Sequence, residues 1–89
     1  MKQAIGIVET KSLVAAIQAS DTMVKAADVH VADFNYVGSG IVAVIVSGEV
    51  AAVTAAVESA QETVSGIAQV ISATVIARPH DEVDKMINQ

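Results

Sequence analysis

Apolar residues recur along this chain with two different periods, and the change between them predicts where strands and helices lie. Four short runs rich in valine, isoleucine and alanine have the composition of strands, at residues 4–8, 29–34, 41–46 and 67–76. Two longer stretches repeat apolar residues every three to four positions, as helices do, over residues 11–27 and from Glu49 to a closing Gly66. Pro79 ends the last strand, and a shorter helix is predicted over residues 81–87.

This order of elements predicts an α+β fold of the ferredoxin-like kind, β-α-β-β-α-β, with a four-stranded antiparallel sheet and a short C-terminal helix. The run at 41–46 is apolar on both faces, so it is expected to be a central strand. Gly6 lies inside the first strand and has no side chain to pack, which indicates close approach by another backbone. A chain of 89 residues has room for one domain, expected to span residues 1–89.

Both long helices are predicted to be amphipathic. The apolar side of the first is made of Leu13, Ala16, Ile17, Ser20, Met23, Val24 and Ala27, and its polar side of Lys11, Gln18, Asp21, Thr22 and Lys25. Asp21 and Lys25 are four residues apart with the acid first, which favours an ion pair. The second helix has a stripe of Val50, Val53, Val57, Ala60 and Val64, opposite Ala51, Ala52, Ala55, Ala56, Glu58 and Glu62. Either Thr10 or Ser12 is expected to cap the first helix.

The composition favours a protein that associates with copies of itself. Hydrophobic residues make up 53% of the chain and charged residues 17%, so apolar surface is left over that a neighbouring subunit can cover. The net charge of −5, without a basic stripe, disfavours nucleic-acid binding. There is no cysteine for disulfides or thiolate metal sites. With no signal peptide and no apolar run near the roughly 20 residues that span a bilayer, a soluble cytoplasmic protein is expected.

The sequence contains no pattern of residues that indicates a catalytic site. Its two histidines, His30 and His80, lack metal-ligand spacing; His30 is interpreted as a strand surface residue. His80 precedes Asp81 and Glu82, which the start of a helix explains, because carboxylates favour a first turn. No nucleophile triad, phosphate loop or buried carboxylate pair can be made out. We therefore expect no enzymatic activity, no catalytic residue, no metal and no cofactor.

Five motifs, in order and spacing, resemble those of a known family. They are Gly6-Ile7-Val8-Glu9-Thr10-Lys11, Asp21-Thr22-Met23-Val24-Lys25-Ala26-Ala27, Tyr36-Val37-Gly38-Ser39-Gly40, Val46-Ser47-Gly48-Glu49-Val50 and Ile76-Ala77-Arg78-Pro79-His80. Together they resemble the hexamer-forming, single-domain shell proteins of bacterial microcompartments (the BMC domain), as in carboxysomes and the propanediol- and ethanolamine-utilisation compartments. The resemblance covers roughly residues 4 to 87.

The resemblance implies a structural shell protein of the bacterial cytoplasm, forming homohexamers that tile into facets. Residues matching the pore loop on the six-fold axis are Tyr36, Val37, Gly38, Ser39 and Gly40. Residues matching the edge between hexamers are Lys25, Arg78, Pro79 and His80. The implied partners are neighbouring hexamers, other shell proteins, encapsulated enzymes and small polar metabolites that cross the pore. The alternative is a ferredoxin-like regulatory module that binds a small molecule between subunits.

Two departures from the family pattern remove positive charge. Tyr36-Val37 stands where the family usually has Lys-Ile, and Ser47-Gly48-Glu49 where it often has Arg-Gly-Asp. Both changes predict weaker enrichment of anionic solutes than in relatives that carry those cations.

Overall fold

The computed structural model describes residues 3–64 and 70–77, and it confirms the predicted order of strands and helices. The elements are β1 (Ala4–Thr10), α1 (Leu13–Ala26), β2 (His30–Gly38), β3 (Ile41–Gly48), α2 (Val50–Val64) and β4 (Val70–Ile76). The strands form one antiparallel sheet in the order β2-β3-β1-β4, the predicted ferredoxin-like α+β arrangement. The helix predicted over residues 81–87 lies outside the described residues.

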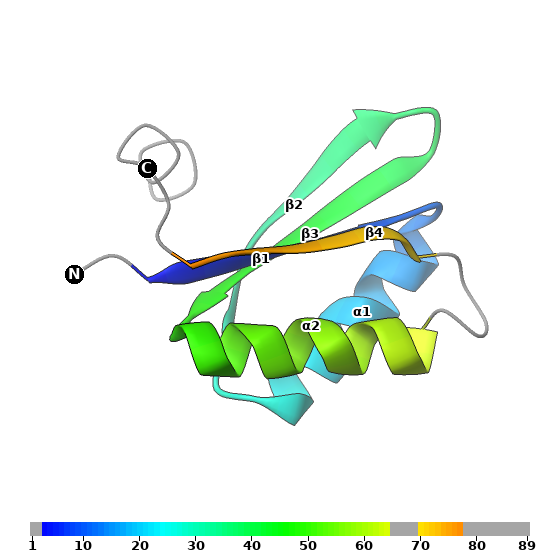
Figure 1. The fold of residues 1–89 in the computed structure, drawn as a ribbon. Coiled ribbons are helices and arrows are strands. Elements are labelled where there is room, and N and C mark those ends of the chain that lie inside the picture. The colour runs from blue at the N-terminus through cyan, green and yellow to red at the C-terminus, as the bar shows by residue number, and fades with distance from the viewer. Residues whose placement is uncertain (1–2, 65–69, 78–89) are drawn as a thin grey trace.

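Both helices pack on the same face of the sheet (Figure 1). α1 lies mainly against β3 and β1, whereas α2 lies against β1 and β4. The core between these layers is built almost entirely from valine and alanine, with Met23 as its largest fully buried side chain. Small and β-branched side chains allow the helices to approach the sheet closely, which suits a flat two-layer molecule.

The predicted close approach at Gly6 is confirmed, but side chains rather than a backbone make it. A Cβ built on Gly6 would lie 2.7 Å from Cγ2 of Val57 and 2.8 Å from Cγ1 of Val53. Both valines project from α2 onto the central strand β1. Glycine at this position therefore sets how near α2 comes to the sheet.

The strands are longer than the sequence predicted. β1 continues to Thr10 and β3 to Gly48, so Gly48 closes the strand rather than breaking it at residue 46. β2 runs to Gly38 instead of ending at residue 34. β2 is longer because it stays paired with β3 up to the turn that joins them. β1 and β3 are longer because they stay paired with each other from Ala4 and Gly48 to Thr10 and Val42. The part of the predicted last strand before Val70 lies outside the described residues.

The predicted apolar side of α1 is only partly the buried one. Ala16 and Met23 face the core as predicted, but Leu13, Ile17 and Val24 are exposed, and their place is taken by the smaller Ala15 and Ala19. The sheet lies so close to the helix that alanine fills the gap where leucine or isoleucine would clash. The larger side chains are turned aside, onto a second apolar stripe.

The second helix begins at Val50, one residue after the predicted Glu49, and the predicted closing residue Gly66 lies outside the described residues. On α2, Val53, Val57 and Ala60 are buried as predicted, whereas Val50 is exposed and Ala56 is buried. The side chain of Val64 lies outside the described residues. Ser12 is the N-cap of α1, because its hydroxyl accepts a hydrogen bond from the Ala15 amide at 3.1 Å.

Candidate functional site

The turn that the sequence singled out closes the β2–β3 hairpin, which projects beyond the rest of the sheet in Figure 1. Gly38 pairs with Ile41, leaving Ser39 and Gly40 as a two-residue turn. Both turn residues and the preceding Gly38 have positive φ angles: 115° at Gly38, 55° at Ser39 and 80° at Gly40. Positive φ at both central residues is the requirement of a type I′ turn, whose twist matches that of paired strands.

The tip of this hairpin is exposed and carries no charge. Tyr36 is 68% exposed and Val37 is 55% exposed. The register between β2 and β3 shifts between Tyr36 and Gly38, so Val37 has no partner on β3. From Phe34 to Ile41 the chain has no Asp, Glu, Lys, Arg or His. The polar groups at the tip are therefore hydroxyls, one amide side chain and the backbone.

A buried threonine at the end of β1 holds the hairpin close to its turn, a role that the sequence did not reveal. The Thr10 hydroxyl lies 2.9 Å from the carbonyl of Ser12 and 3.3 Å from that of Val42, and the residue is fully buried. Thr10 is therefore a strand residue that links β1, the start of α1 and β3, and is not the helix cap. Its signal in the sequence, a polar residue at the end of an apolar alternation, also fits a cap.

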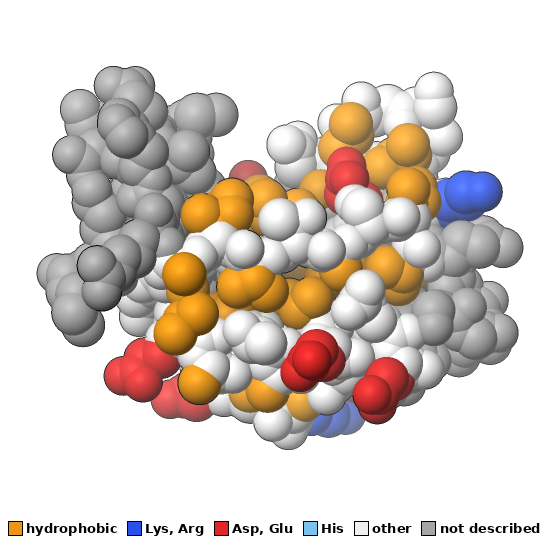
Figure 2. All heavy atoms as spheres, in the orientation of Figure 1, with side chains coloured by type: hydrophobic (Ala, Val, Ile, Leu, Met, Phe, Trp, Pro, Cys, Tyr) orange, Lys and Arg blue, Asp and Glu red, His pale blue; other side chains and the backbone are white. Residues whose placement is uncertain are grey.

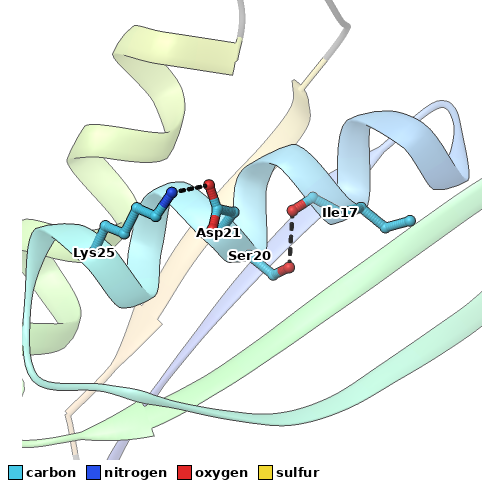
Figure 3. Close-up of polar contacts among 4 residues, drawn as sticks. All are labelled: Ile17, Ser20, Asp21 and Lys25. Atoms are coloured by element: carbon cyan, nitrogen blue, oxygen red, sulfur yellow. Dashed lines mark hydrogen bonds and ion pairs between the residues drawn. The ribbon is translucent and has the colours of Figure 1, made fainter.

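Lys25, the predicted edge residue that the structure describes, lies on the outer side of α1 (Figure 3). Its ammonium group is 2.9 Å from a carboxylate oxygen of Asp21, so the predicted ion pair is confirmed. The two side chains are 74% and 59% exposed, and such a pair contributes only about 0.3–0.5 kcal/mol. Arg78, Pro79 and His80 lie outside the described residues, so the structure does not place them beside Lys25.

The two edges of the sheet carry different apolar surfaces. In the half of the molecule that contains β2, β3 and α1, large hydrophobic side chains are exposed on α1 and β2: Leu13, Val14, Ile17, Val24 and Val31. Ser20 lies among them, and its hydroxyl donates to the carbonyl of Ile17 at 2.9 Å (Figure 3), so its polarity is satisfied locally. At the β4 edge, Ile71 and Val50 are exposed. Figure 2 shows apolar side chains spread over the surface of β4 and α2.

The sheet face opposite the helices carries one polar contact that the sequence did not predict. The Ser72 hydroxyl on β4 donates to a carboxylate oxygen of Glu9 on β1 at 2.5 Å. His30 and Asp33 on β2 are exposed. Within the described ranges, no cluster of His, Asp and Glu could hold a metal ion. Nor does any helix described have the length and apolar character needed to cross a bilayer.

A four-stranded antiparallel sheet of this order, with two helices on one face, defines the ferredoxin-like class of α+β proteins. Within that class, the model of the BMC domain family matches residues 4–79. The bacterial microcompartment shell protein PduA of Citrobacter freundii is 44% identical over 86 residues, 97% of this chain and 92% of the relative. The carboxysome shell protein CsoS1A of Hydrogenovibrio crunogenus is 42% identical over 85 residues, 94% of this chain and 88% of the relative.

A solved structure shows the same likeness. The structure of a microcompartment protein from Desulfitobacterium hafniense DCB matches 93% of this chain with a TM-score of 0.81 and 30% identity. This chain spans about 45% of that protein's length. The chain therefore belongs to the BMC-domain family of bacterial microcompartment shell proteins. Shell proteins of this family are structural, so the prediction that the chain is not an enzyme is confirmed.

Proposed function

We propose that the chain, as a single BMC domain over residues 1–89, forms a cyclic homohexamer that tiles into the facets of a microcompartment shell. Small polar metabolites cross the shell through a pore at the centre of each hexamer. Its partners are neighbouring hexamers, other shell proteins and the enclosed enzymes, in the bacterial cytoplasm. The six-fold number comes from the family resemblance, and the chemistry of the surfaces supports a ring.

The observation that carries the proposal is the pair of unlike apolar surfaces at the two sheet edges. The half of the molecule that contains β2, β3 and α1 presents the α1 stripe of Leu13, Ile17 and Val24, whereas the β4 edge presents Ile71 and Val50. A two-fold dimer uses the same patch on both subunits and would leave one of these surfaces in water. Head-to-tail contact joins one edge to the other, and it closes into a ring when the rotation fits.

The β2–β3 hairpin is the part of the subunit that we assign to the pore. Tyr36, Val37, Gly38, Ser39 and Gly40 form an exposed tip that projects away from the helices. A Cβ on Gly38 would meet no atom of its own subunit within 4 Å, so backbone groups there can face an opening without obstruction. Copies of this tip around an axis give a ring of hydroxyl and backbone groups, the usual lining of a selective pore.

The edge between hexamers is assigned to Lys25, together with Arg78, Pro79 and His80. Lys25 is suited to contact a neighbouring particle because its side chain is mostly exposed and lies outside the core face of α1. The planar guanidinium of arginine can hold several acceptors in fixed geometry across such an edge.

Light scattering and negative-stain microscopy together test the assembly. Dilute protein is expected to give about six times the chain mass of 9.1 kDa, and concentrated protein is expected to give sheets or tubes. A monomer at micromolar concentration would overturn the ring. Discrete dimers or trimers that never form sheets would instead favour the regulatory alternative.

A further inference from the structure

The tip of the β2–β3 hairpin is unusual in an acidic chain because it presents polar groups without charge. The chain carries a net charge of −5, yet no Asp, Glu, Lys, Arg or His occurs from Phe34 to Ile41. The largest exposed side chain there is Tyr36. A phenol gives and accepts hydrogen bonds but, unlike a cation, exerts no long-range attraction on an anion.

We propose that the opening formed by residues 36–40 admits uncharged polar solutes in preference to anions, and that Tyr36 determines this selectivity. The inference rests on the ring proposed above. Hydroxyl and amide groups replace part of the water around a polar solute at close range. The negative field of the whole assembly lowers the local concentration of anions, and no cation within residues 34–41 offsets it.

The register of the sheet fixes where Tyr36 lies. Phe34 pairs with Val44 and Tyr36 with Val42, so both occupy the same face of the hairpin. Phe34 packs against the core, whereas Tyr36 lies two residues further along, beyond the cover of the helices, and is 68% exposed. Its partner Val42 is buried, and the carbonyl of Val42 accepts from Thr10. The strand segment that carries the phenol is therefore held in place by its pairing with Val42, which Thr10 in turn binds.

Lys11 is the cation that competes with this assignment. Its carbonyl oxygen lies 3.6 Å from the position of a Cβ on Gly40, so its backbone is beside the turn. The residue is exposed, and its ammonium group lies at the end of a flexible stem that solvent can surround. The proposal assigns the selectivity to Tyr36 rather than to Lys11, and the experiment includes Lys11 as a separate variant.

A single introduced thiol measures the local potential directly, because the chain has no cysteine. Ser39→Cys is labelled in the hexamer with two methanethiosulfonates of similar size, one bearing a sulfonate and one uncharged. The ratio of the anionic to the neutral labelling rate is compared with and without Tyr36→Lys. We expect the ratio to rise about tenfold at 10 mM salt and to fall within about twofold of the parent at 1 M salt.

Two control variants separate the possible outcomes. Gln18→Lys adds the same charge on the outside of α1 and should leave the ratio unchanged. Lys11→Gln should also leave it unchanged; if it lowers the ratio more than Tyr36→Lys raises it, Lys11 sets the selectivity and the proposal is wrong. An unchanged ratio in Tyr36→Lys on an intact hexamer also overturns it. Where Ser39→Cys does not assemble, Val37→Cys carries the thiol instead.

Failure of the ring is recognised separately by light scattering. If the labelled protein is monomeric, each thiol meets only the lysine of its own chain, and the ratio should rise only about twofold. That result, with a monomer mass, overturns the proposed function. A hexamer mass with an unchanged ratio overturns only the role of Tyr36.

Discussion

Ser39 has a left-handed backbone, with φ at 55°, between two glycines that also have positive φ. Non-glycine residues adopt this conformation at some cost, and asparagine tolerates it better than serine. Strain of this kind persists where the surroundings or the function require the residue. The pore lining proposed above would give the hydroxyl of Ser39 such a function.

The first prediction follows from this strain. Ser39→Asn should raise the free energy of unfolding by about 0.5–1 kcal/mol, because Asn-Gly is the preferred pair in a type I′ turn. The measurement is a urea titration at one fixed protein concentration, since assembly also adds to stability. Ser12→Asn is the matched control, because asparagine and serine cap helices equally well. A lower midpoint for Ser39→Asn than for the control would show that the turn is not strained at this residue.

Gly6 gives the second prediction, at the contact between β1 and α2. Gly6→Ala should lower the free energy of unfolding by about 1–3 kcal/mol, because its methyl group would meet Val57 and Val53 below 3 Å. Combining it with Val57→Ala should recover about 1 kcal/mol relative to the sum of the single changes. Denaturant titrations of the two single variants and the double variant give this coupling. Simple additivity would mean that α2 moves away from the sheet as a rigid body.

At the scale of the elements, α1 shows what hydrophobic periodicity can and cannot predict. The pattern correctly predicts a helix, its polar side and the Asp21–Lys25 pair. It assigned Leu13, Ile17 and Val24 to the core face, because a scale of hydrophobicity ranks them above alanine. The buried face depends instead on the distance between helix and sheet, which the valines of β1 and β3 determine after the layers have packed.

The exposed stripe of α1 supports the third prediction. Ile17→Asp should weaken the hexamer and raise the concentration at which it dissociates by at least about tenfold, because a carboxylate would be buried at the contact between subunits. Gln18→Asp places the same charge one residue along the helix and should leave assembly unchanged. Light scattering over a dilution series measures both. If both variants dissociate alike, the stripe is not a subunit contact.

The position of the turn between β2 and β3 was predicted correctly, but the length of β2 was not. Gly-Ser-Gly marks a turn because glycine adopts positive φ freely, and the structure confirms positive φ at all three residues. The length of β2 was underestimated, since Asn35 and Tyr36 gain strand structure only by pairing with β3. Likewise, Thr10 and the Glu9–Ser72 contact depend on residues far apart in the sequence, which periodicity within one segment does not connect.

At the scale of the whole molecule, the predicted pore and edge residues stay predictions, because both roles require neighbouring copies. The sequence places Lys25 and Tyr36 on exposed positions, and one subunit confirms that exposure. What a residue contacts in an assembly is decided by the partner surface, which the periodicity of a single chain does not encode.

The fourth prediction therefore concerns assembly beyond the hexamer. Lys25→Ala should leave the hexamer intact, because the lost pair with Asp21 is worth only about 0.3–0.5 kcal/mol within the subunit. The same variant should abolish sheets, because the proposed contact between neighbouring hexamers loses its lysine. Lys11→Ala is the matched control, as it removes an exposed lysine near the other end of α1. Light scattering reports the hexamer, and negative-stain microscopy reports the sheets. Sheets that persist in Lys25→Ala would remove this residue from the edge.

In the described part of the chain, helices cover one face of the sheet only. A ring produced by rotation about a single axis contains no operation that turns a subunit over. Its two sides therefore always present different atoms. A wall of such rings, all in the same orientation, therefore has a direction. A molecule travelling inward meets the two surfaces in one order, and a molecule travelling outward meets them in the opposite order. The distinction between interior and exterior is then a property of the chain's own topology.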